Sequence, residues 1–107
     1  MALYELRQYK VRDGQMAAWL NLMEGEIIPY VISKGMVLTA SFCAIDDPTT
    51  YIWMRRFEDE ADRERLYAKV YENERWVSDL SPKIGELLVR EESVIHRLVP
   101  THLSPLQ

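Results

Sequence analysis

The residues with the clearest capacity for chemistry fall within the first ten positions of the chain, where Glu5, Arg7 and Tyr9 alternate with other residues. A spacing of two places all three side chains on one face of a strand. An arginine can bind a carboxylate or an enolate, and a carboxyl group and a phenol can transfer protons. A plainer interpretation is also open, in which Glu5 and Arg7 form an ion pair that fills a dimer interface.

A second alternating segment contributes Trp53 and Arg55. In the strand order 4-1-3-2 the first and third strands are neighbours, so these two side chains are expected beside Arg7 and Tyr9. Two arginines at close range repel each other unless an acid or an anionic ligand lies between them, and Glu5 is a candidate for that acid. We therefore take Arg7, Tyr9, Trp53 and Arg55 as candidate substrate-binding residues.

His96 is the only histidine on a predicted strand, and imidazole is the natural base near neutral pH. His96 and Glu5 are the candidate catalytic residues, although a purely structural histidine fits the same position. Both faces of the last strand are mixed, which leaves open the direction in which His96 points. Neither histidine has companions at metal-ligand spacing, so we expect no metal site, and no motif calls for a cofactor.

The elements that must position these residues follow from the apolar pattern. Alternation predicts strands over 3–11, 37–45, 50–57 and 93–99, with a turn at 46–49. Helical spacing predicts helices over about 14–33, with Pro29 disturbing the last turns, over about 59–71 with Asp59 as the N-cap, and over about 76–88 with a bend or restart at Pro82. The order is that of an α+β, ferredoxin-like split βαβ fold with a four-stranded antiparallel sheet. A parallel α/β unit is the alternative, and the hairpin over 37–57 counts against it.

The predicted sheet has two dissimilar faces. We assign its aliphatic side chains, including Leu6, Ile52 and Met54, to the face that the helices cover. The other face is then aromatic and charged, and an open patch of this kind usually marks an interface or a pocket. The sequence therefore predicts a homodimer that forms through this sheet face and encloses a cavity between the sheet and the partner.

Composition narrows the classes of function. The 107 residues are expected to form a single domain over 1–107, and 17 acids against 13 bases argue against a nucleic-acid partner. No apolar run approaches the roughly 20 residues of a membrane span. The start shows no signal peptide, and Cys43 is the only cysteine, which together favour a cytoplasmic location. The apolar neighbours of Cys43 predict a buried thiol.

Several segments in order resemble the NIPSNAP-domain family: the opening YELRQYKV with DGQ, the stretch YIWMRRFEDEADRER with ENERW, and the ending LVPTHLSPLQ. The resemblance implies a ferredoxin-like fold that dimerises into an α+β barrel, within the wider group that includes small cofactor-free monooxygenases. Arg63 matches the arginine that marks the family's second helix, and we interpret it as a structural anchor to a nearby acid or carbonyl. The chain departs from the family at 46–49, where members commonly have a glycine-containing turn.

Two classes of function stay open. The first is a dimeric barrel that binds a small aromatic or anionic molecule in its cavity, with or without acting on it as a cofactor-free enzyme. The second is a non-catalytic structural or protein-interaction module in which the same residues close the dimer. Charged side chains on an aromatic sheet face favour the first class, because a dry interface is depleted of charge at its centre.

Overall fold

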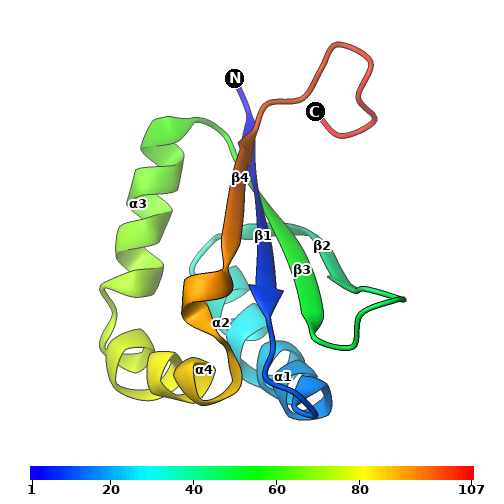
Figure 1. The fold of residues 1–107 in the computed structure, drawn as a ribbon. Helices are drawn as coiled ribbons and strands as arrows, with labels where there is room; N and C mark the ends of the chain where they lie inside the picture. Colours follow the sequence, from blue (N-terminus) through cyan, green and yellow to red (C-terminus); the bar gives the residue numbers. More distant parts are fainter.

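A computed structural model describes all 107 residues of the chain. One sheet carries a single layer of helices (Figure 1). In chain order the elements are β1 (Leu3–Lys10), α1 (Met16–Leu22), the π turn η1 (Met23–Ile27), α2 (Ile28–Ser33), β2 (Val37–Cys43), β3 (Thr50–Phe57), α3 (Glu60–Tyr71), the π turn η2 (Trp76–Leu80), α4 (Ser81–Leu87), the 3-10 turn η3 (Arg90–Glu92) and β4 (Val94–Leu98). None of the helices combines the length and the apolar character that crossing a membrane requires.

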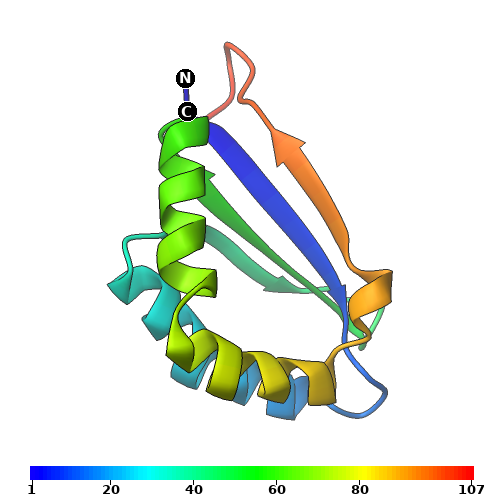
Figure 2. The same cartoon turned by 90° about the vertical axis from the view of Figure 1, so that its left-hand side faces the viewer.

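The sheet is antiparallel throughout and has the strand order β2-β3-β1-β4, which confirms the predicted α+β topology. All the helices lie on one side of it (Figure 2). In the central pair, Glu5 stands opposite Arg55, and Arg7 stands opposite Trp53. The two segments singled out by their chemistry are therefore direct neighbours, as expected.

The face that the helices cover is the opposite of the predicted one. Trp53 and Arg55 are 2% and 0% exposed, and Glu5 is 1% exposed, so the aromatic and charged face is the core face. Leu6 and Ile52 alternate with these residues and lie on the other face, which no helix covers. This face can be buried because Glu5 forms ion pairs with the arginines beside it, and the aromatic rings supply the larger apolar area.

Two helical regions are interrupted in the same way. The predicted helix over 14–33 consists of α1, η1 and α2, and Pro29 falls in the first turn of α2. In the last helical region η2 is followed by α4, with Pro82 in its first turn. A proline has no N–H and clashes with the carbonyl one turn back, and in both regions a widened π turn precedes it.

Local signals at two other boundaries are confirmed. The Asp59 side chain accepts a hydrogen bond from the backbone N–H of Asp62 at 2.8 Å, which makes it the N-cap of α3. In the connection from β2 to β3, the Asp47 carboxylate accepts hydrogen bonds from the backbone N–H and the hydroxyl of Thr49 at 2.9 and 2.7 Å. An aspartate thus stabilises this glycine-free turn.

Cys43 is exposed at the end of the edge strand β2, so the expected burial of its thiol is wrong.

The C-terminal tail packs against the open side of the sheet. It turns back to the start of β1, where the Gln107 carbonyl accepts hydrogen bonds from the Tyr4 hydroxyl and from Arg56 at 3.0 and 2.8 Å. Both ends of the chain therefore lie close together (Figure 1).

Candidate functional site

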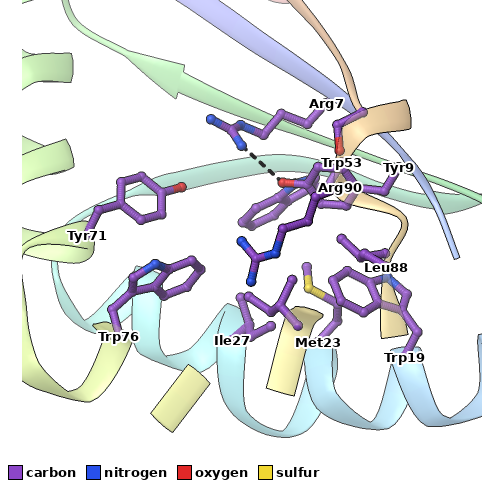
Figure 3. Close-up of a pocket in the computed structure, with 12 residues that line it drawn as sticks. Arg7, Tyr9, Trp19, Met23, Ile27, Trp53, Tyr71, Trp76, Leu88 and Arg90 are labelled. Carbon is purple, nitrogen blue, oxygen red and sulfur yellow. Dashed lines mark hydrogen bonds between the residues drawn. The ribbon is translucent and has the colours of Figure 1, made fainter. Parts of the chain in front are cut away.

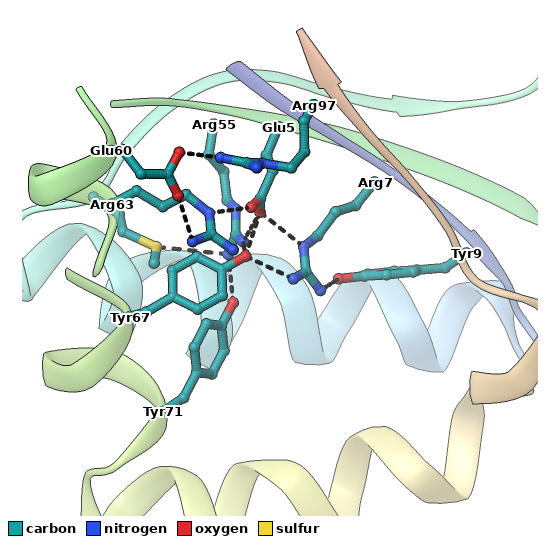
Figure 4. Close-up of polar contacts among 10 residues, drawn as sticks. Glu5, Arg7, Tyr9, Arg55, Glu60, Arg63, Tyr67, Tyr71 and Arg97 are labelled. Carbon is teal, nitrogen blue, oxygen red and sulfur yellow. Dashed lines mark hydrogen bonds and ion pairs between the residues drawn. The ribbon is translucent and has the colours of Figure 1, made fainter. Parts of the chain in front are cut away.

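The polar centre of the molecule is the carboxylate of Glu5, which the core face of β1 holds beneath α3 (Figure 4). Arg55 Nη2 donates to Glu5 Oε1 at 2.5 Å, and Arg7 Nε donates to the same oxygen at 3.2 Å. Arg63 Nε donates to Oε2 at 2.9 Å, which confirms Arg63 as an anchor to a nearby acid. Three guanidinium groups thus converge on one buried carboxylate.

A hydroxyl group completes the surroundings of that carboxylate. The Tyr67 hydroxyl donates to Glu5 Oε1 at 2.5 Å and accepts from Arg7 and Arg55 at 2.8 and 3.0 Å. Burial alone would raise the pKa of Glu5, but the hydrogen bonds from Tyr67, Arg55 and Arg63, together with the charge of Arg55, lower it from 4.5 to about 2. Glu5 is therefore ionised at neutral pH.

The helix α3 supplies its share of this network through one stripe of side chains. Arg63, Tyr67 and Tyr71 follow one another at a spacing of four, which places them on the same face of the helix. The Tyr71 hydroxyl accepts from Arg55 Nη1 at 2.5 Å. Tyr67 and Tyr71 were not predicted as site residues, although their spacing of four and eight from Arg63 places them on its helix face.

Tyr9 and Trp53 continue the network along the core face of the sheet. The Tyr9 hydroxyl accepts hydrogen bonds from Arg7 Nη1 at 3.2 Å and from the indole N–H of Trp53 at 3.1 Å. The guanidinium of Arg55 lies over the Trp53 ring, 4.8 Å from its centroid. The five neighbouring residues of β1 and β3 thus form one continuous set of contacts.

A cavity of about 150 Å³ lies beside this network, between the sheet and the helices of the same chain (Figure 3). Its polar side chains are Arg7, Tyr9, Tyr71, Arg90 and Ser93. Its apolar walls come mainly from the three tryptophans Trp19, Trp53 and Trp76 with Met23, Ile27, Ile84 and Leu88. An apolar cavity of about this volume in another protein holds benzene, so the space suits a single ring.

The structure brings together most of the predicted site residues, but on the face of the sheet that the helices cover and not on the open face. Arg7, Tyr9 and Trp53 line the cavity, while Glu5 and Arg55 lie buried beside it. The cavity is internal to the protomer, not enclosed between the sheet and a second copy. The expectation of a cavity behind a dimer partner is therefore corrected.

His96 is not part of this site. It pairs with Leu6 across β4 and β1, and Leu6 lies on the open face of the sheet. Its side chain is therefore on the opposite side of the sheet from Glu5, Arg7 and the cavity. The structure thus separates the two residues that were predicted to share proton transfer.

Arg90 and Ser93 were missed as site residues because no periodic pattern points to them. Arg90 begins the turn η3, and Ser93 lies between η3 and β4. Both line the cavity, and the Arg90 guanidinium donates to the carbonyl and to the hydroxyl of Ser81, the latter at 3.1 Å. Their contribution makes the polar part of the cavity cationic. No group of three histidine, cysteine or carboxylate side chains lies close enough together to hold a metal ion.

Comparison with known proteins agrees with the fold. The chain aligns over its whole length with a NIPSNAP family protein of Agrobacterium tumefaciens, at 29% identity and a TM-score of 0.89, covering 100% of both chains. A second protein of that organism, a NIPSNAP family protein with unknown function, has 28% identity and a TM-score of 0.88, with 99% of this chain and 94% of that chain covered. An uncharacterized NIPSNAP-like domain protein of Burkholderia xenovorans has 25% identity and a TM-score of 0.86, with 97% and 89% covered.

A search of curated proteins finds no match for the chain. A comparison with family profiles does find one. The profile of the NIPSNAP family matches residues 4–105, which is nearly the complete chain and includes the ion network and the cavity. The protein is therefore a member of the NIPSNAP family.

Proposed function

We propose that the protein binds a small anionic aromatic molecule in the cavity between its sheet and its helices. The observation that carries this proposal is the composition of the cavity wall, which combines two arginines, Arg7 and Arg90, with three tryptophans. Guanidinium groups are suited to carboxylates and similar anions, and indole rings are suited to stacking against an aromatic ring.

The charge balance supports an anionic ligand. Arg7, Arg55 and Arg63 share the single carboxylate of Glu5, and only Arg63 reaches a second acid, Glu60, at 3.0 Å. Arg7 lines the cavity, and 17% of its side chain is exposed, so its guanidinium group can be reached from that space. An anion bound there would offset the excess positive charge of the network.

The same geometry favours binding over a proton-transfer role for the residues predicted as catalytic. A carboxyl group with a pKa of about 2 is a weak base at neutral pH, and Glu5 is already committed to three arginines. His96 lies on the other face of the sheet. We therefore propose Arg7, Tyr9, Trp53 and Arg90 as ligand-binding residues, and Glu5 and Arg55 as the residues that hold Arg7 in place.

The binding proposal is tested by titrating the protein with benzoate and following tryptophan fluorescence, because three tryptophans line the cavity. Saturable quenching is expected, and Arg90→Gln should weaken binding by about tenfold through the loss of one charged contact. Arg65→Gln is the matched control, since Arg65 is an exposed arginine on α3 that pairs with Asp62 away from the cavity. Absence of saturable quenching, or equal affinities of both variants for benzoate, would contradict the proposal.

We also propose that two copies pair through the open face of the sheet. This face carries exposed apolar side chains, among them Phe42 at 63%, Val94 at 42% and Leu98 at 38% exposure. An apolar area of this kind on a sheet usually marks a protein interface. This interface replaces the aromatic and charged one predicted from the sequence.

A protein-interaction module is the alternative function, and the open face is the observation that favours it. Such a module needs this face but does not need the cavity. A protein that dimerises but binds no benzoate would therefore favour the interaction module. For its location we propose the cytoplasm, supported by a single cysteine that is exposed and forms no disulfide.

A further inference from the structure

The hydroxyl group of Tyr9 has an unusual balance of hydrogen bonds. It accepts from Arg7 Nη1 at 3.2 Å and from Trp53 Nε1 at 3.1 Å, and both of these nitrogens can only donate. A tyrosine hydroxyl has two acceptor positions and one proton to donate. Its acceptor positions are therefore filled, while its own proton has no acceptor in the protein. Tyr9 lines the cavity (Figure 3).

The other polar groups of the cavity are donors as well. The indole N–H of Trp19 is buried and has no hydrogen-bond partner. The Tyr71 hydroxyl accepts from Arg55, so its proton is also left for another acceptor. None of the side chains that line the cavity carries a carboxylate or an amide oxygen. The cavity thus offers several hydrogen-bond protons, and its side-chain acceptors are limited to hydroxyl oxygens such as that of Ser93.

We propose that the site takes its ligand in the deprotonated form, with the ligand's oxyanion accepting the hydrogen bond of Tyr9. This inference rests on the proposed binding function and adds the residue that selects the ionisation state. A neutral phenol or carboxylic acid has one acceptor position fewer than its anion, and it brings a proton for which the cavity has no carboxylate or amide acceptor. A site built to pair one form discriminates strongly against an analogue that cannot pair. Tyr9 is therefore a specificity-determining residue.

The proposal is tested with 4-nitrophenol, a single-ring phenol whose ionised form is coloured. The ionisation of the bound phenol is followed by its absorbance across a pH series with the protein in excess. Occupancy is followed separately by quenching of tryptophan fluorescence. The bound phenol is expected to ionise with a pKa at least about one unit lower than in free solution, which corresponds to a tenfold preference for the anion.

Two tyrosine variants identify the group responsible. Tyr9→Phe removes the hydroxyl but keeps both arginines, so it should still bind 4-nitrophenol, with a clearly smaller downward pKa change than the unaltered protein. Tyr4→Phe is the matched control, because the Tyr4 hydroxyl donates to the Gln107 carbonyl on the other side of the sheet. That variant should behave like the unaltered protein in both measurements.

A comparison of ligands tests the proposal without a variant, which matters because Tyr9 is a packed core residue. Benzamide has nearly the shape of benzoate but is neutral and carries two N–H donors, so it should bind at least about tenfold more weakly. Benzamide binding as tightly as benzoate, or bound 4-nitrophenol with an unchanged pKa, would overturn this inference and leave the binding function standing. Failure of both benzoate and 4-nitrophenol to quench the fluorescence would overturn the binding function and this inference with it.

Discussion

Glu5 and Arg55 occupy directly opposite positions on β1 and β3, and Arg55 Nη2 lies 2.5 Å from Glu5 Oε1 with both side chains 1% exposed. Neither charge would be tolerated in the core without the other, because an unpaired buried ion costs several kcal/mol. The pair therefore explains how a strand face with charged residues can lie under the helices. It also fixes the position from which Arg7 reaches the cavity.

Replacing the buried acid should destabilise the fold. Glu5→Gln keeps the shape of the side chain but leaves three arginines without their shared carboxylate, so we expect the free energy of unfolding at pH 7 to fall by about 3–5 kcal/mol. Urea denaturation measures the change. Glu58→Gln is the control, because Glu58 pairs with Arg56 at 71% exposure and its loss should change stability by less than about 0.5 kcal/mol. Equal stability of the two variants would show that the network does not stabilise the fold.

The stability contributed by Glu5 should depend on pH in a defined window. Its pKa is about 2 in the folded protein against an ordinary value of 4.5, so the folded state favours the ionised form. The contribution is therefore fully present above pH 4.5 and is lost as the pH falls toward 2, by roughly 3 kcal/mol in all. Unfolding curves at several pH values should show the advantage of the unaltered protein over Glu5→Gln shrinking across this range. A difference that stays constant from pH 5 to pH 2 would be inconsistent with the lowered pKa.

Two glycines should respond in opposite directions to the same substitution. Gly85 lies inside α4, and an added Cβ would meet the flexible Arg90 guanidinium at an ordinary contact distance of 3.5 Å. Gly85→Ala should therefore raise the free energy of unfolding by about 0.5–1 kcal/mol. Gly14 has open space around it but a φ of +74°, so Gly14→Ala should lower the same quantity by about 1 kcal/mol. Thermal unfolding of both variants checks the signs, and a stabilising Gly14→Ala would contradict the backbone argument.

A charge on the open face of the sheet should prevent dimer formation. Phe42→Asp places a carboxylate within the proposed apolar interface, on the edge strand β2, where it replaces a large exposed ring. Sedimentation at micromolar concentration should show a dimer for the unaltered protein and a monomer for this variant. Ile45→Asp is the control, since Ile45 is 99% exposed in the loop after β2 and should leave the dimer intact. A monomeric unaltered protein would refute the interface directly.

The topology could be predicted from the sequence because local patterns determine it. Alternation located β1 and β3, and Asp59 marked the start of α3. The choice of the covered face could not be predicted in the same way. Alternation shows which residues share a face, such as Leu6 with its neighbours or Trp53 with Arg55, but the covered face depends on whether buried charges find partners. Tyr67 is one such partner, and it lies sixty-two positions from Glu5 along the chain.

Part of the candidate site could also be predicted from the sequence. Neighbouring strands were enough to bring Glu5, Arg7 and Arg55 together, and this contact is present. The position of Arg90 depends on a short 3-10 turn that has no sequence period, and it could not be expected. The face of the sheet on which His96 lies depends on the register between β4 and β1. A strand whose two faces are both mixed does not specify that register.

The alternation along β1 has a consequence for how this protein can change over time. Arg7 belongs to the cavity, whereas Leu6, the residue before it, belongs to the open face. The residues proposed to bind a small molecule and those proposed to contact a second copy therefore alternate along the same strand. A substitution at one position can therefore change the cavity without changing the open face, and a substitution at the next position can do the reverse.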